Sequence, residues 1–162
     1  MSYYISMSDI CFNIKNENKE TALLLLKNLI KTRQNLSWIN NDTILRAETL
    51  DEALRECRYE IEEDDNGNAY YMAFTGEKSG DDYEIFKAIA PAVEDGSYIE
   101  MTGDDGDKWR WVFKEGECSE IDPKIEWNTV KNVNENMLKT AIFIELDKFR
   151  ELLKKLPAIA RM

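Results

Sequence analysis

The stretch GSYIEMTGDDGDKWRWVFKEGE, residues 96–117, decides the fold of this chain because it contains two turn signals among strand-forming residues. Asp105-Gly106 is a strong signal for a tight β-hairpin, and Glu115-Gly116 marks a second turn. The segments around these turns are rich in aromatic and β-branched residues, which favour strands. The stretch therefore predicts a β-meander in the second half of the chain.

The position of the first turn predicts which side chains share a face of this meander. A two-residue turn at Asp105-Gly106 places Glu100 opposite Trp111, and cross-strand partners share a face. The second turn adds further acids to the same face. The candidate partner-binding residues on this aromatic and acidic face are Tyr98, Glu100, Trp109, Trp111, Glu120 and Asp122.

Two interpretations of this face follow. In the first, Trp109 and Trp111 belong to the core and the acids lie at the rim, because large aromatic side chains usually bury most of their area. In the second, this face binds a partner, since tryptophan and tyrosine are enriched in binding hot spots and acids suit a basic surface. Burying an unpaired carboxylate is costly. We therefore expect Glu100 to reach water, a partner, or a base of the last predicted helix, such as Lys139 or Arg150.

Outside the meander, helical and strand patterns interleave along the chain. Thr49 and Glu52 have the spacing of a helix capping box, and the following residues 50–65 carry an apolar stripe. The other expected elements are strands over 3–14, 36–39 and 70–74, a turn over 64–68, helices over 19–33, 82–93 and 147–156, and a polar connector over 128–136. These elements predict a single α+β domain over residues 1–162, in which an antiparallel sheet with a meander in the C-terminal half packs against three to four helices.

The charge of the chain restricts its partners. There are 32 acidic and 21 basic residues, which give a net charge of -11, and the acids are concentrated in residues 48–65 and 94–126. Nucleic acids and membrane surfaces are anionic, so we expect direct contact with neither. The same charge speeds encounter with a basic protein. A basic protein is therefore the expected partner, and residues 51–65 are the second candidate surface for it.

The residue content argues against most catalytic chemistry. The chain has no histidine, which removes the commonest general base and every histidine-bound metal site. No cysteine pair has zinc spacing, no nucleotide-binding glycine motif is present, and neither acidic glycine turn completes a calcium loop. A pair drawn from Glu100, Glu120 and Asp122 could still act as acid and base. The sequence therefore predicts a protein that is not an enzyme and uses no cofactor or metal.

The cysteines and the N-terminus predict the compartment. Cys11, Cys57 and Cys118 are far apart in the sequence and odd in number, which favours free thiols in a reducing cytoplasm. The N-terminus has no basic leader followed by an apolar run, and no segment is long and apolar enough to span a membrane. We therefore expect a cytoplasmic protein.

Three functional hypotheses remain. The first is a small acidic intracellular protein without catalytic activity that occupies a basic surface of a partner and inhibits it. Immunity proteins against toxins, and inhibitors of nucleic-acid enzymes carried by mobile elements, share this composition, and the likeness is one of composition alone. The second is a carboxylate-dependent enzyme or small-ligand binder with an aromatic and acidic pocket. The third is a scaffold subunit that forms a homodimer through its aromatic face.

Overall fold

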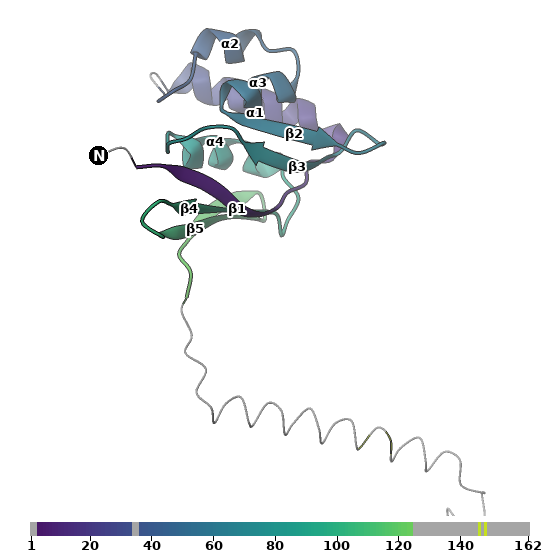
Figure 1. The fold of residues 1–162 in the computed structure, drawn as a ribbon. Helices are drawn as coiled ribbons and strands as arrows, with labels where there is room; N and C mark the ends of the chain where they lie inside the picture. The colour runs from purple at the N-terminus through teal and green to yellow at the C-terminus, as the bar shows by residue number, and fades with distance from the viewer. Residues whose placement is uncertain (1–2, 34–35, 125–145, 147, 149–162) are drawn as a thin grey trace, which may run out of the picture. The chain divides into compact units, whose positions relative to one another are not determined.

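The computed structural model describes residues 3–33, 36–124, 146 and 148 of the chain (Figure 1). The strands are β1 (Ile5–Cys11), β2 (Tyr59–Glu63), β3 (Ala69–Phe74), β4 (Tyr98–Gly103), β5 (Lys108–Lys114) and β6 (Glu117–Ile121). The helices are α1 (Lys19–Thr32), α2 (Asn41–Arg46), α3 (Leu50–Glu56) and α4 (Asp82–Ile89), with short 3-10 turns η1 (Asn16–Asn18) and η2 (Ala90–Ala92). The chain divides into two compact units, Met1–Pro123 and Lys124–Met162, and all the named elements belong to the first.

The fold class predicted from the sequence is confirmed. An antiparallel sheet has the strand order β1-β4-β5-β6, and its last three strands form the expected meander. A second sheet consists of the antiparallel hairpin β2-β3 (Figure 1). The connector predicted over 128–136 and the helix predicted over 147–156 lie outside the described residues, and a single domain over 1–162 stays a prediction.

A single core joins the two sheets to the helices, and Phe86 of α4 lies at its centre. The Phe86 ring centroid is 5.0 Å from that of Tyr59 on β2 and 5.0 Å from that of Trp111 on β5. Phe113 completes the group at 6.1 Å from Phe86. Because one side chain of α4 touches both sheets, the helix holds the β2-β3 hairpin against the β-meander.

The helix predicted over residues 50–65 is wrong in its second half. The capping box at its start is present, with Thr49 and Glu52 each accepting a hydrogen bond from the backbone of the other, but α3 ends at Glu56. Arg58 then adopts a left-handed backbone conformation with φ of 69°. Such a conformation costs a non-glycine residue roughly 1 kcal/mol or more, so contacts elsewhere must hold it. The residues after Arg58 form β2 instead of a further helical turn.

The contacts that hold Arg58 come from the loop before α4 and from its first turn. The Arg58 guanidinium donates to the Lys78 carbonyl oxygen at 2.6 Å and to the buried Asp82 carboxylate at 3.0 Å. The Tyr59 hydroxyl donates to the same Asp82 oxygen at 3.0 Å. Burial, together with the neighbouring Asp82 charge, raises the pKa of Tyr59 well above its ordinary value, which keeps this hydroxyl a donor. Tertiary contacts thus end α3 where local periodicity would continue it.

Two further differences from prediction lie between α1 and α3. Residues 36–39 do not form the expected strand; Leu36 is buried in the core and Trp38 has a left-handed φ of 65°. The short helix α2 was not expected. Its N-cap is Asn40, whose side chain accepts hydrogen bonds from the backbone N–H groups of Asp42 and Thr43. A helix of this length contains too few turns to show a clear apolar period.

The cysteines and the helices bear on the expected compartment. Cys11 is exposed, Cys57 and Cys118 are buried, and none of the three forms a disulfide. None of the helices in the described part of the chain is both long and apolar enough to cross a membrane. The cytoplasmic location itself stays a prediction.

Candidate protein-binding surface

The β4-β5 hairpin turns differently from the prediction. Its loop contains three residues, 104–106, because the Gly103 N–H donates to the Asp107 carbonyl oxygen at 2.8 Å and closes the hairpin around them. Gly106 occupies the last loop position with φ of 90°, a conformation that favours glycine. A Cβ at Gly103 would meet the Tyr3 hydroxyl, the end of an exposed side chain, so a larger residue there would displace Tyr3.

This loop shifts the strand pairing by one residue, so the predicted pairing of Glu100 with Trp111 is wrong. Glu100 pairs with Arg110, and Ile99 pairs with Trp111. A shift of one residue moves every side chain of a strand to the other face, so the apolar pattern decides the register. The observed register places Ile99 and Met101 on the core face with Trp111, and all three are buried.

The second turn of the meander is confirmed. Glu115 and Gly116 have left-handed φ values of 54° and 75°, which suit a two-residue hairpin turn. Trp111 therefore pairs with Glu120, and the Trp111 indole Nε1–H donates to the Glu120 carboxylate at 2.8 Å. This hydrogen bond satisfies the polar atom of a tryptophan that is only 2% exposed.

The six predicted partner-binding residues do not form one surface. Trp111 lies in the core and Trp109 is half-buried against it. Tyr98 and Glu100 lie on the opposite face of the sheet, as the alternating burial of β4 shows. The remaining acids, Glu120 and Asp122, are exposed at the end of the meander. The structure therefore does not bring Glu100 and Glu120 to one face as a catalytic carboxylate pair, because Glu100 pairs with Arg110, whose other partner is Ile121.

Arg110 organises the outer face of this sheet, which carries Tyr98 and Glu100. The Arg110 guanidinium lies 4.1 Å from the centre of the Tyr98 ring and donates to Glu100 at 2.6 Å. The Tyr98 hydroxyl donates to Asp9 at 2.9 Å, and Lys108 donates to Glu100 at 3.2 Å. Asp9 and Glu100 thus have basic partners within the chain, which are supplied by Arg110 and Lys108 of β5. The alternative bases from the last predicted helix, Lys139 and Arg150, lie outside the described residues.

Hydrogen bonds from Arg110 and Ser8 lower the pKa of Glu100 from its ordinary value of 4.5 to about 2. A carboxyl group with a lowered pKa in the folded state stabilises the fold above its unfolded-state pKa and loses this contribution as the pH falls. We expect Glu100→Gln to be less stable than the native chain above pH 4.5, with the difference shrinking as the pH falls towards 2. Urea unfolding at a series of pH values measures this difference.

The matched variant for this test is Arg110→Met, which removes the strongest donor to Glu100 and keeps much of the side-chain volume. In that background Glu100→Gln should change the pH dependence far less. A difference between the native chain and Glu100→Gln that stays constant from neutral pH to the acid limit would contradict the proposed pairing.

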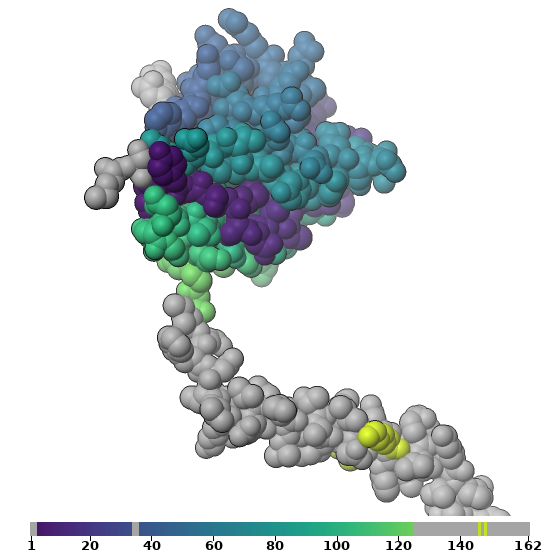
Figure 2. All heavy atoms as spheres, viewed as in Figure 1, coloured from purple at the N-terminus to yellow at the C-terminus, as the bar shows by residue number. Residues whose placement is uncertain are grey.

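The hairpin β2-β3 with its turn is a second candidate surface, which we call the acidic hairpin. It carries five acids within six residues: Glu60, Glu62, Glu63, Asp64 and Asp65. All five are exposed: Glu60 and Glu62 alternate with the buried Tyr59, and the other three lie at the end of β2 and in the turn. Figure 2 shows the turn of this hairpin protruding from the surface of the Met1–Pro123 unit.

The turn of the acidic hairpin is internally ordered. The Asp64 carboxylate accepts hydrogen bonds from the backbone N–H groups of Asn66 and Asn68, each at 2.9 Å, and from the Asn68 side chain. These bonds, with those of the Asn68 side chain largest, lower the pKa of Asp64. Gly67 has φ of 76° and ends a three-residue loop, 65–67, which the Asp64 N–H closes by donating to the Asn68 carbonyl oxygen at 2.9 Å. The turn therefore presents its acids from a defined backbone.

Several acids of the hairpin have no basic partner among the described residues. Lys19 pairs with Glu63 at 2.7 Å, but no described lysine or arginine forms an ion pair with Glu60, Glu62 or Asp65. Exposed aromatic rings accompany these acids, since Tyr70 and Tyr71 are 49% and 37% exposed. The Tyr70 hydroxyl donates to Glu62 at 2.8 Å. Acids without basic partners beside exposed tyrosines suit a basic protein surface, because tyrosine is enriched in binding hot spots and opposite charges attract.

The sequence contained signals for this hairpin that the helical period masked. Residues 59–63 alternate between apolar and acidic side chains, which indicates a strand, and Asn66-Gly67 is a strong hairpin dipeptide. The apolar stripe of α3 happens to continue through Ile61 at helical spacing. Residues 59–63 therefore fit both the helical period and the strand period, and the contacts of Arg58 favour the strand.

Neither a metal site among the described residues nor a known relative assigns a chemical activity to these surfaces. Within residues 3–33 and 36–124 no cluster of three or more acids or cysteines could hold a metal ion. No protein-family model, curated protein or solved structure matches the chain.

Proposed function

We propose that this chain is a non-catalytic protein that binds a basic surface of a partner protein through its acidic hairpin and inhibits that partner. The observation that carries the proposal is the group of exposed acids without basic partners, Glu60, Glu62 and Asp65, beside Tyr70 and Tyr71. An acidic side chain that is already ion-paired attracts a basic partner more weakly, because its charge is balanced within the chain. Asp9 and Glu100 of the outer sheet face are paired in this way, so the acidic hairpin is the stronger candidate.

The net charge of -11 supports inhibition as well as binding. Enzymes that act on nucleic acids carry basic surfaces for phosphate groups, and an acidic protein that covers such a surface competes with the nucleic acid. Long-range attraction between opposite charges also raises the association rate. The supported partner class is therefore a protein with a basic functional surface.

The test neutralises the acidic hairpin and a matched set of exposed acids elsewhere. The hairpin variant is Glu60→Gln with Glu62→Gln and Asp65→Asn. We expect this variant to lose at least about tenfold in affinity for a basic partner captured from the native host, and the loss to shrink at high salt because salt screens surface charges. Isothermal titration with the captured and purified partner measures the affinity.

The matched control is Glu17→Gln with Glu48→Gln and Glu117→Gln, three exposed acids outside the hairpin that remove the same number of negative charges. The proposal requires the control to bind nearly as tightly as the native chain. Equal losses in both variants would show that net charge alone attracts the partner. Recovery of only a second copy of the chain would favour a homodimeric scaffold instead.

A further inference from the structure

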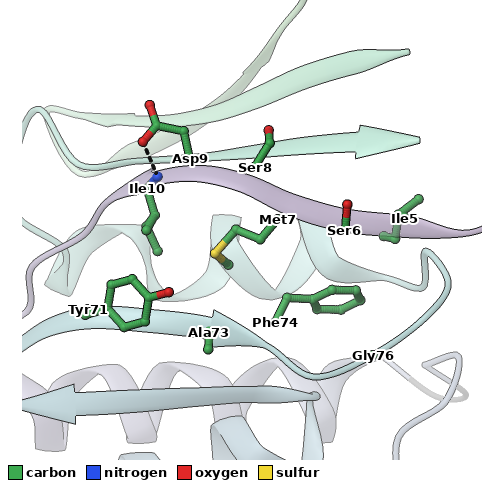
Figure 3. Close-up of a pocket in the computed structure, with 10 residues that line it drawn as sticks. All are labelled: Ile5, Ser6, Met7, Ser8, Asp9, Ile10, Tyr71, Ala73, Phe74 and Gly76. Atoms are coloured by element: carbon green, nitrogen blue, oxygen red, sulfur yellow. Dashed lines mark hydrogen bonds between the residues drawn. The ribbon is translucent and has the colours of Figure 1, made fainter. Parts of the chain in front are cut away.

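A cleft of about 530 Å³ lies between β1 and β3, the neighbouring edge strands of the two sheets (Figure 3). The strands are tied together at both ends of the cleft. At one end Ile14 and Ala69 exchange two backbone hydrogen bonds of 2.8 and 2.9 Å, and at the other the Ile5 N–H donates to the Glu77 carbonyl oxygen at 2.9 Å. The pairing of each edge strand with its neighbour contains an irregularity between these ties. Bulges bend strands, which accounts for the separation of the two edges.

The edges that face the cleft carry main-chain groups without strand partners. In an antiparallel strand the N–H and C=O groups of alternate residues point away from the paired neighbour. The main-chain N–H of Ile5 points away from β4, because it donates to the Glu77 carbonyl oxygen. By alternation, the main-chain groups of Met7 point the same way. The Thr75 N–H donates to the Arg58 carbonyl oxygen on the β2 side, so the main-chain groups of the preceding residue, Phe74, point towards the cleft. No backbone hydrogen bond crosses between the described strands β1 and β3 inside the two ties.

The side chains around the cleft provide an apolar wall. Figure 3 shows Met7 and Ile10 pointing from β1 towards β3, where Tyr71, Ala73 and Phe74 lie opposite them. Ser8 and Asp9 point away from β3 in the same view. Unpaired main-chain edges beside apolar side chains are the features by which proteins recognise extended peptides, because the backbone supplies hydrogen bonds and the pockets accept alternate side chains.

The rim of the cleft is acidic. Glu60 and Glu62 supply this charge: they are the cross-strand partners of Ala73 and Tyr71, so they share the face of β3 that lines the cleft. The Asp9 carboxylate of β1 points away from β3 and already pairs with Arg110 at 3.8 Å. The residues that line the cleft include no lysine or arginine. The charge therefore complements a basic occupant.

We propose that the cleft binds an extended basic segment of the partner protein, which adds to the β1 or β3 edge and places apolar side chains against Met7 and Ile10. This inference rests on the proposed function and names the part of the partner that is recognised. The lysine or arginine side chains of the segment, which alternate with the apolar ones, reach Glu60 and Glu62. The cleft and the acidic hairpin then form one continuous recognition surface.

The test uses the full chain and a short, capped peptide of alternating lysine and valine. We expect binding in NMR titrations, with amide chemical-shift changes concentrated at Met7, Ile10, Met72 and Phe74. A peptide methylated at alternate backbone nitrogens should bind about tenfold more weakly, because it loses two or more main-chain hydrogen bonds. The peptide with glutamate in place of lysine should not bind.

A protein variant provides the second arm. Ala73→Trp fills the cleft with an indole and should abolish peptide binding, whereas Ser119→Trp, on the exposed surface of β6, should not. Thermal unfolding establishes that each variant is folded; if Ala73→Trp is not, the methylated peptide with the native chain decides the question. Absence of binding by the lysine–valine peptide at millimolar concentration overturns the proposal.

The outcomes separate this inference from the proposed function. If partner binding depends on the acids of the hairpin but not on Ala73→Trp, and the peptide shifts only residues near the hairpin turn, the cleft proposal is overturned and the proposed function stands. If neutralising the acidic hairpin also leaves partner binding unchanged, both proposals are overturned. If an apolar small molecule binds in the cleft and the lysine–valine peptide does not, the proposal of a peptide occupant is likewise overturned.

Discussion

Replacing Trp111 with alanine should lower the free energy of unfolding by about 3–5 kcal/mol, the cost of truncating a large buried aromatic side chain. Trp111 is 2% exposed and its ring packs against Phe86 at 5.0 Å and Trp109 at 6.1 Å. The variant also leaves the Glu120 carboxylate without its indole donor. Urea unfolding followed by circular dichroism measures the loss.

Trp38→Ala is the matched control for this experiment. Trp38 is 64% exposed, so its truncation should change the free energy of unfolding by about 0.5 kcal/mol or less. A Trp111→Ala variant as stable as Trp38→Ala would contradict the assignment of Trp111 to the core. Such a result would favour the other interpretation of the sequence, in which Trp111 contacts a partner.

Asp82→Ala should destabilise the fold by about 3–5 kcal/mol, because removing one member of a buried ion pair leaves its partners unsatisfied. The Asp82 carboxylate is 1% exposed and accepts hydrogen bonds from Arg58, from the Tyr59 hydroxyl and from the Gly80 N–H at 2.7 Å. Arg58 would lose the contact that helps to hold its left-handed backbone. We expect a lower urea midpoint.

The control for Asp82 is Glu94→Ala, which breaks an exposed ion pair with Lys15. Exposed pairs of this kind contribute about 0.5 kcal/mol or less. In a double-mutant cycle, Arg58→Met should cost less in the Asp82→Ala background than in the native chain. Additive effects of Arg58→Met and Asp82→Ala would show that the two residues do not act as a pair.

Local signals in the sequence determined the class of the fold and several of its elements. The capping box at Thr49 predicts the start of α3, and it is confirmed because both of its hydrogen bonds lie within one helical turn. The turn at Glu115-Gly116 is confirmed for the same reason, since the two residues adopt the left-handed conformation that a two-residue hairpin requires. The α+β class follows from the order of such elements.

The candidate surface was less accessible to prediction. The sequence placed six residues on one face of the meander, but Trp111 lies in the core while Tyr98 and Glu100 lie on the outer face. The acidic segment over 51–65 was recognised as a second surface, but as a helix. Its acids are where the charge pattern indicated, and the structure changes the backbone that carries them.

Only the tertiary structure decided the register of β4-β5 and the end of α3. The two possible hairpin loops differ by one residue, and the burial of Ile99 and Met101 on the face of Trp111 selects between them. The chain leaves α3 at Arg58 because Asp82 and the Lys78 carbonyl oxygen, which are distant in sequence, bind its side chain. Composition and local periodicity determined which elements form, whereas contacts between distant residues decided where they end and which faces they present.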